Sequence, residues 1–248
     1  MNEIGTPDAK RRGGRRERRD LRTRPDHAML PTLAGQLPLT EPMDQEQIER
    51  IDAASLDILE EIGVVFRDDI ALEDWRKAGA DVRGERVHLD RGLVKSLIKT
   101  IPSEITLHAR NPEKTVALGG RQSIFIPMTG APYLRDLEDV RRAPTLDDLT
   151  TFHKLAHMLP AMHSSAHHIV EPMDHPISHR HLRITHSSML YSDKTFMGMT
   201  TSGQNAEDVL DMCAILFGEE YLETHAVVTG NCNGNSPLVW DETMLSAM

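Results

Sequence analysis

The sequence predicts an α/β fold of the (β/α)8 TIM-barrel type, with only about the first half of the barrel present. From residue 122 onward, apolar runs alternate with polar loops and helical segments, a pattern typical of parallel strands joined by crossover helices. A complete eight-fold barrel takes roughly 250 residues, and the alternating part covers only residues 120–248. We therefore expect a basic, disordered tail at 1–24, a small α+β element at 25–119 and the truncated barrel at 120–248.

The composition narrows the class of protein. The chain has 248 residues, of which 39% are hydrophobic, and this is enough for a sizeable core. No run approaches the ~20 apolar residues of a membrane span, and no apolar stretch follows the basic N-terminus as it would in a secretory signal. Cys213 and Cys232 form no disulfide framework, so we expect a cytoplasmic protein without membrane contact.

The basic residues are concentrated near the N-terminus of a chain whose net charge is −10. Many of them lie between Lys10 and Arg24. No aromatic residues are interleaved with these arginines, so we expect no nucleic-acid partner. We favour a solvated tail, and an arm that contacts another subunit is the alternative.

The α+β element is expected to begin with a helix at Asp44. Asp44 is a typical N-cap residue, Gln47 completes a capping-box pattern, and Gly63 stands where a C-cap glycine belongs. The pattern then predicts a strand at 64–66, a helix at 69–78, a hairpin at 80–89 turning at Arg83-Gly84, a helix at 90–100 and strands at 105–109 and 115–118.

The barrel half is expected to contain four strands, each followed by a helix. Thr145 carries the start signal of the first helix and Asn205 that of the third. The second helix is expected near 175–191, and Met248 should lie within the fourth. The apolar runs predict the strands themselves at 123–128, 162–170, 194–200 and 226–229.

Several short motifs recur in a familiar order between residues 40 and 248. They are Glu60-Glu-Ile-Gly-Val64, Ala78-Gly-Ala80, Ala109-Arg-Asn-Pro112, Met128-Thr-Gly130, Arg141-Arg-Ala-Pro-Thr-Leu-Asp-Asp148 and Asn235-Ser-Pro-Leu238. This ordered set resembles the N-terminal half of the trimethylamine:corrinoid methyltransferase family, whose members are full barrels about twice as long. The resemblance implies an enzyme that moves a methyl group from a methylated amine to the cobalt of a separate corrinoid protein, with no cofactor bound directly.

The resemblance also bears on the substrate. Some members carry pyrrolysine late in the barrel and use trimethylamine, whereas others lack it and act on quaternary amines such as glycine betaine. That position lies beyond Met248. The arginine-rich tail is similar to members without pyrrolysine, so we favour a betaine-type substrate. We also expect a homo-oligomer at full length and no activity from the 248 residues alone.

The implied chemistry asks for binding and orientation rather than for proton transfer. A quaternary ammonium leaves as a neutral tertiary amine, so no general acid is needed, and catalysis rests on positioning. A permanent cation is held by aromatic faces or by a carboxylate. A carboxylate on the substrate calls for donors such as amides, imidazoles or backbone N–H groups.

The candidate binding residues follow the predicted strands, because barrel active sites lie at the C-terminal strand ends. Gly230 and Gly234 flank two asparagines, so the backbone can turn and bring both amides over the barrel mouth; the alternative is that these amides only satisfy loop backbone groups. Catalytic residues stay unknown. The substrate-binding candidates are Thr129, Gly130, His168, Asp174, Asn231 and Asn233.

Two other functions compete with this interpretation. A metal-dependent barrel hydrolase would use the histidine-rich segment, where His153 and His157 share a helix face and His179-Arg-His181 is similar to the two-histidine motif of amidohydrolases. That motif belongs at the end of the first strand, whereas here it begins a helix, so we predict no metal site. The other alternative is a non-catalytic, betaine-binding fragment.

Overall fold

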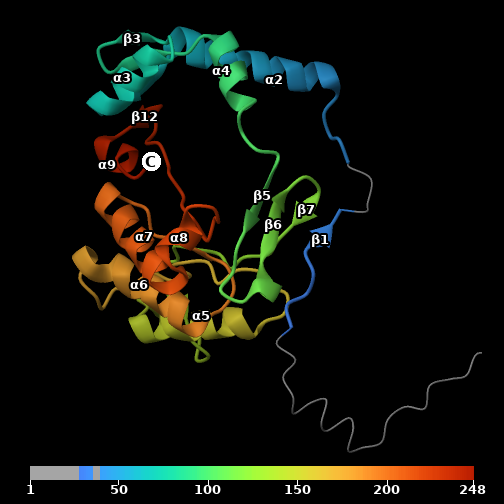
Figure 1. Ribbon diagram of the computed structural model, residues 1–248, viewed down its shortest axis with the longest axis vertical. Helices are drawn as coiled ribbons and strands as arrows, with labels where there is room; N and C mark the ends of the chain where they lie inside the picture. Colours follow the sequence, from blue (N-terminus) through green and yellow to red (C-terminus); the bar gives the residue numbers. More distant parts are fainter. Residues whose placement is uncertain (1–27, 36–39) are drawn as a thin grey trace, which may run out of the picture.

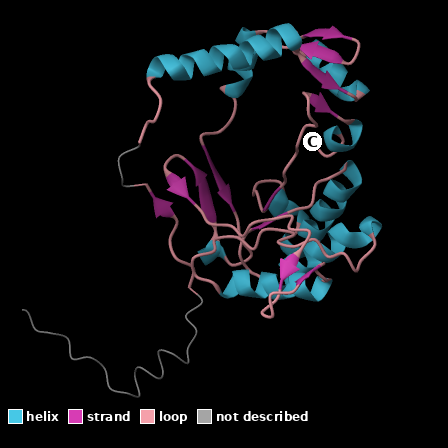
Figure 2. Cartoon of the chain, turned by 180° about the vertical axis from the view of Figure 1, so that it is seen from behind, coloured by secondary structure: helices cyan, strands magenta, loops and turns pink. Residues whose placement is uncertain are grey.

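The computed structural model describes residues 28–35 and 40–248 (Figure 1). The predicted basic tail at 1–24 lies outside the described residues. The early helices α2 to α4 lie together at one end of the molecule, and α5 to α7 lie at the other end (Figure 1). The strands are short and dispersed among helices and loops (Figure 2).

The first helix has the ends that the sequence predicts. In α2 (Gln45–Asp57) the Asp44 side chain accepts from the Gln47 backbone N–H, and the Gln47 side chain accepts from the Asp44 N–H. The helix continues as a π-helical turn, η1 (Ile58–Ile62), and ends at Gly63 with φ of 72°. A Cβ on Gly63 would lie 2.6 Å from the Val87 carbonyl oxygen, so the close approach of this backbone requires glycine.

The α+β element is built around a mixed sheet of order β12-β2-β4-β3. Its predicted parts are present within one or two residues, and their apolar side chains form one core cluster with Val87 fully buried at its centre. The turn of the hairpin lies at Gly84-Glu85, one residue beyond the prediction. The elements are β2 (Val64–Phe66), α3 (Asp69–Lys77), β3 (Asp81–Arg83), β4 (Arg86–His88) and α4 (Arg91–Ile98).

The fourth strand of this sheet comes from the other end of the chain. β12 (Val239–Trp240) pairs with β2 in parallel, with Trp240 opposite Phe66. Trp240 and Leu245, from the short helix α9 (Glu242–Leu245), pack against the core cluster. A helix is present where the fourth one was expected, but it ends at Leu245, before Met248, and Leu245 packs against the N-terminal sheet.

Two antiparallel pairs connect this element to the rest. β5 (Glu104–Leu107) pairs with β6 (Val116–Gly119) around the 3-10 turn η2 (Pro112–Lys114). β7 (Gln122–Ser123) pairs with β1 (Leu33–Ala34). The barrel strand predicted at 123–128 is thus wrong at its start, and Pro127, which has no N–H, lies in a stretch of irregular structure after it.

Four segments beyond residue 123 lie side by side in parallel and in chain order. Single parallel bridges join Ala131 to Val170 and Ser164 to Thr195. β10 (Phe196–Met197) pairs in parallel with β11 (Val228–Thr229). Regular strands are shorter than predicted, and 162–170 holds only bridges, in part because Ala166 has a positive φ of 54°. The described residues contain mixed helices and small sheets and no closed barrel.

Helices α5 (Leu146–Met158), α6 (Ile177–Tyr191) and α7 (Gly203–Phe217) connect these segments. Thr145 caps α5 as predicted. The cap predicted at Asn205 is wrong, because the Ser202 side chain accepts from the Asn205 backbone N–H and α7 begins earlier. The elements that were not predicted include the hairpin of β8 (Leu134–Arg135) with β9 (Arg141–Arg142), and the short helix α8 (Glu219–Leu222). Within the described ranges no helix is long and apolar enough to cross a membrane.

Candidate functional site

The parallel pairing brings the ends of the four segments to one edge of the molecule. The Gly130 N–H donates to the His168 carbonyl oxygen at 2.7 Å, and the Gly198 N–H donates to Thr229 O at 2.8 Å. A Cβ on Gly230 would lie 2.7 Å from Thr200 Oγ1, so these two segment ends are also adjacent. We refer to residues 129–131, 167–171, 198–202 and 229–233 as the strand-end edge.

Gly130 lies against the His168 ring at this edge. Its φ is +80°, a conformation that side chains rarely adopt, and a Cβ built on it would lie 3.4 Å from His168 Nε2. Two of the predicted binding residues are therefore in contact through backbone and ring. Thr129, the third, precedes Gly130 and is exposed.

A carboxylate that was not among the predicted binding residues stands beside His168. Glu171 Oε2 lies 3.7 Å from His168 Nε2, while Glu171 Oε1 accepts from Arg180 Nη1 at 2.6 Å. The three side chains are each less than a fifth exposed. Arg180 is itself fixed by bonds from Nη2 at 2.8 Å and from Nε at 3.2 Å to the His175 carbonyl oxygen. One oxygen of Glu171 is thus held by α6, and the other faces the strand-end edge.

The histidines at this edge are held in the neutral form. Burial, with the neighbouring His168 and His153, lowers the pKa of His167 to about 3. Burial lowers the pKa of His168 as well, although Glu171 opposes this, and it also lowers the pKa of His153. His153 Nε2 donates to the His167 carbonyl oxygen at 2.6 Å, and its Nδ1 then accepts from Ser187 Oγ at 2.9 Å. His153 therefore supports the end of the segment as a structural residue.

The remaining histidines show no arrangement for a metal. In the part of the chain that the structure describes, no group of three or more His, Cys, Asp or Glu side chains could hold an ion. His181 lies within α6 and binds Asp208 of α7 at 2.6 Å, so it joins two helices. His157 lies 3.2 Å from Asp193. These described residues therefore offer no metal centre for the hydrolase alternative.

Asp174 is occupied elsewhere. Its Oδ1 accepts from the Leu146 backbone N–H at 2.9 Å, at the first residue of α5, and lies 3.2 Å from His175 Nδ1. A carboxylate at a helix N-terminus stabilises the helix through the unpaired N–H groups there. Glu171 therefore fits the role of a carboxylate at the edge better than Asp174 does.

Asn231 and Asn233 follow β11 directly, and both are exposed. Among the described residues neither side chain makes a hydrogen bond, so the structure does not show them satisfying loop backbone groups. Their loop leads from the strand-end edge to β12 in the N-terminal sheet. At the far end of this loop, the Asn235 amide donates to the Asp241 carboxylate at 2.5 Å. The two amides are thus free to bind a ligand at the edge.

Aromatic side chains contribute little here. Tyr133 is exposed, but the Arg141 guanidinium lies 4.0 Å above its ring. Trp240 packs in the N-terminal core. A cation at this edge would therefore rely on a carboxylate rather than on an aromatic cage.

Comparison with known proteins decides the family. A sequence model of the trimethylamine methyltransferase (MTTB) family matches residues 11–248. This chain belongs to the trimethylamine methyltransferase family. The resemblance seen in the short motifs is confirmed.

The relatives within the trimethylamine methyltransferase family are named as methyltransferases. The chain is 41% identical over 213 residues to the glycine betaine methyltransferase of Desulfitobacterium hafniense strain Y51, covering 86% of this chain and 44% of that protein. It is 25% identical over 201 residues to the trimethylamine methyltransferase MttB of Desulfitobacterium hafniense strain DSM 10664 / DCB-2, covering 78% of this chain and 40% of the relative. It is also 32% identical over 112 residues to the proline betaine:corrinoid methyltransferase of Eubacterium limosum, covering 44% and 22%. The chain spans less than half the length of these relatives.

Proposed function

We propose that this chain forms part of a methyltransferase that moves a methyl group from a quaternary amine of the glycine betaine type to the cobalt of a separate corrinoid protein. The observation that carries the proposal is the 41% identity over 86% of the chain to a glycine betaine methyltransferase. The relative named as a proline betaine:corrinoid methyltransferase supports the corrinoid partner.

The chemistry of the strand-end edge agrees with such a substrate. The C–N bond of a quaternary ammonium breaks with its electron pair on nitrogen, which leaves as a neutral tertiary amine, so no proton is transferred. Reduced cobalt on the partner supplies the electron pair for the new bond to the methyl carbon. An edge with neutral histidines and one carboxylate matches this requirement, because it can bind a cation without acid–base chemistry.

Each polar residue then has a binding role. The free oxygen of Glu171 attracts the ammonium, since Arg180 fixes the position of the carboxylate. The amides of Asn231 and Asn233 donate to the carboxylate of the substrate. Gly130 leaves room beside His168 for a ligand to approach.

We further propose that residues 124–230 make the first half of a (β/α)8 barrel. Four parallel segments in chain order, with α5, α6 and α7 between them, support this arrangement. An experimental structure at the length of the relatives tests it. A barrel whose first four strands are these segments is expected, and an antiparallel strand inserted between any two of them would contradict the proposal.

Turnover by the full-length polypeptide, at the length of the curated relatives, tests the function. Purified protein, a reduced corrinoid protein and glycine betaine are expected to yield dimethylglycine, measured by mass spectrometry. Trimethylamine in place of glycine betaine should yield little dimethylamine. Demethylation of trimethylamine alone would overturn the betaine assignment, and no product from either amine would overturn the proposal as a whole.

A further inference from the structure

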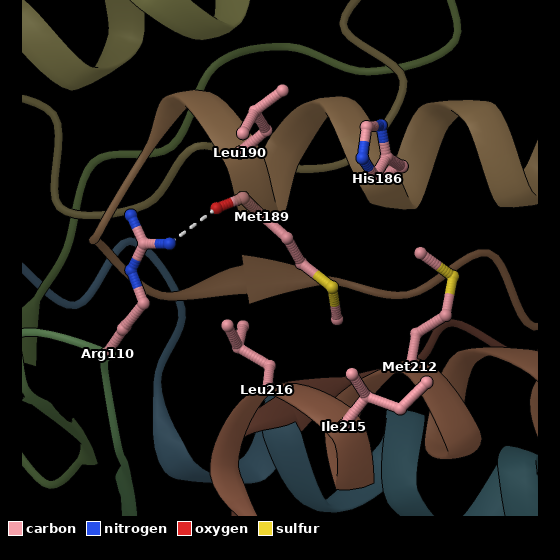
Figure 3. A pocket seen from close by; sticks show the side chains of 7 residues that line it. All are labelled: Arg110, His186, Met189, Leu190, Met212, Ile215 and Leu216. Atoms are coloured by element: carbon pink, nitrogen blue, oxygen red, sulfur yellow. Dashed lines mark hydrogen bonds between the residues drawn. The ribbon is translucent and has the colours of Figure 1, made fainter.

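The outward surfaces of α6 and α7 form an apolar face that no described residue covers. Leu190 on α6 is 53% exposed and Ile215 on α7 is 87% exposed. Between the two helices lies a pocket of about 370 Å³, in which Met189 of α6 faces Met212 and Leu216 of α7 (Figure 3). We call this surface the α6–α7 face. A pocket beside a protruding isoleucine is a surface that a similar side chain can fill.

Arg110 closes one end of this pocket. Its Nη1 donates to the Met189 carbonyl oxygen at 2.9 Å (Figure 3). Met189 lies in the last turn of α6, where carbonyl groups lack partners within the helix, so Arg110 satisfies one of them. The pocket is therefore a fixed feature of the packing between the β5–η2 connection and the two helices.

The charges on the two helices are separated by sign. α6 contains two arginines and three histidines and no acidic residue, whereas α7 contains three acidic residues and no lysine or arginine. Arg183, Glu207 and Asp211 are exposed, and within the described residues none of them makes an ion pair. The face thus presents a basic half and an acidic half on either side of its apolar centre.

The charged side chains of the two halves also lie at the same level along the helix axes. Both helices run from the C-terminal end of one parallel segment back to the start of the next, so they point in the same direction. Arg183 is the seventh residue of α6, and Glu207 and Asp211 are the fifth and ninth residues of α7. The bond between His181 of α6 and Asp208 of α7 fixes the relative height of the helices, so at 1.5 Å of rise per residue Arg183 is level with the stretch between the two acids.

We propose that the α6–α7 face binds the same face of a second copy of this chain. A two-fold axis running along the helices would set α6 of each copy against α7 of the other, as in any isologous dimer. Arg183 of one copy then faces Glu207 and Asp211 of the other, and each Ile215 meets the apolar centre opposite. A wholly acidic partner would be repelled by α7 and a wholly basic one by α6, so the face best fits a copy of itself.

Sedimentation velocity of the full-length polypeptide tests the proposal. The wild-type protein is expected to be dimeric or a multiple of a dimer, and Ile215→Glu is expected to weaken association at least about tenfold, since buried apolar anchors dominate interface energies. Ile70→Glu is the matched control, because Ile70 is 73% exposed and belongs to α3, which lies at the other end of the molecule (Figure 1). A monomeric wild-type protein, or an unchanged oligomer with Ile215→Glu, would overturn the proposal.

A charge reversal separates a specific interface from a general loss of folding. Arg183→Glu alone should weaken the dimer, and so should Asp211→Arg alone. The two substitutions together should associate more tightly than either alone, because the Arg183–Asp211 pair is then inverted rather than removed, while Glu207 keeps its charge. Melting temperatures of all variants report folding independently. Failure of the double variant to associate, with its melting temperature unchanged, would contradict the pairing.

Discussion

Glu171 and Arg180 form a partly buried ion pair at 2.6 Å in which only one carboxylate oxygen is used. The other oxygen stays 3.7 Å from His168 at the strand-end edge. The pair joins the end of one parallel segment to the first turns of the helix that follows. It holds the second carboxylate oxygen in a fixed position at the edge, and we propose that this oxygen contacts the ammonium group of the substrate.

Glu171→Gln is expected to weaken binding of glycine betaine by roughly 1.5–3 kcal/mol, the magnitude of a lost contact with a charged group. Isothermal titration calorimetry on the full-length polypeptide measures this. Asp174→Asn is the control: Asp174 accepts from the first backbone N–H of α5, so its loss should lower the melting temperature slightly and leave affinity unchanged. The opposite pattern would assign the substrate contact to Asp174.

Gly130→Ala should destabilise the fold and disturb His168. The residue has φ of +80° and would place a Cβ 3.4 Å from His168 Nε2. The left-handed conformation alone costs an alanine roughly 1–2 kcal/mol. Gly79→Ala provides the comparison, because Gly79 has φ of +90° with open space around it. Denaturant unfolding should show a larger loss for Gly130→Ala, and equal losses would mean that the His168 contact is unimportant.

Asn233→Ala is expected to reduce affinity for glycine betaine without unfolding the protein. The exposed side chain makes no hydrogen bond among the described residues, so its removal leaves the loop intact. The lost contact with the substrate carboxylate should amount to roughly 1.5–3 kcal/mol. Calorimetric titration beside a melting curve tests this. Unchanged affinity would remove Asn233 from the site. Unchanged affinity together with a lowered melting point would show that Asn233 stabilises the loop instead.

Stability should fall on acidification below neutral pH. The pKa of His167 is about 3 in the folded chain, against an ordinary value near 6.5. Between pH 6.5 and pH 3 the unfolded chain therefore carries a proton on this histidine that the folded chain does not. The contribution of His167 to stability is complete above pH 6.5 and is lost as the pH falls towards 3. For His167 the loss is roughly 1.4 kcal/mol per pH unit. His153 and His168 act in the same direction.

Urea unfolding at pH 7, 6 and 5 measures this slope. His167→Gln should flatten it, whereas His179→Gln, at an exposed position on α6, should leave it unchanged. The carboxyl of Asp148 adds nothing in this window, since Arg142 holds its pKa far below the ordinary value and its contribution is lost only at lower pH. A slope insensitive to His167→Gln would show that other groups govern the acid response.

The 248-residue chain on its own is expected to self-associate and to lack methyltransferase activity. The outer side of β11 and the segment at 124–131 both leave backbone groups open to pairing with other chains. Light scattering over a range of concentrations should show large, polydisperse species. A soluble, active monomer would show that the functional unit is smaller than proposed.

The parts of the fold that depend on near neighbours were predictable from the sequence. The capping boxes at Asp44 and Thr145 involve residues three positions apart, so local chemistry decides them. The pairing of β12 with β2 was not predictable, because Trp240 and Phe66 are distant in the sequence and nothing local distinguishes β12 from the start of a helix. The apolar pattern gave the positions of β10 and β11 but overestimated their lengths.

The candidate site was predictable in the same uneven way. Strand ends were found from apolar runs, and Gly130 and His168 prove to be in contact. Asp174 was predicted in place of Glu171. The sequence does not reveal that Arg180 folds back from α6 to bind the Glu171 carboxylate, or that the Leu146 backbone N–H donates to the Asp174 carboxylate. The signal that could have found Glu171 is its place directly after an apolar segment.

Transfer of an isotopic label tests the central claim most directly. Glycine betaine carrying trideuterated N-methyl groups would be incubated with the full-length polypeptide and a reduced corrinoid protein, and the cobalt-bound methyl group would be analysed by mass spectrometry. The account predicts a trideuterated methyl group on the corrinoid, one equivalent of labelled dimethylglycine, and loss of both when the polypeptide is omitted. A corrinoid without label, found together with unreacted glycine betaine, would contradict the account.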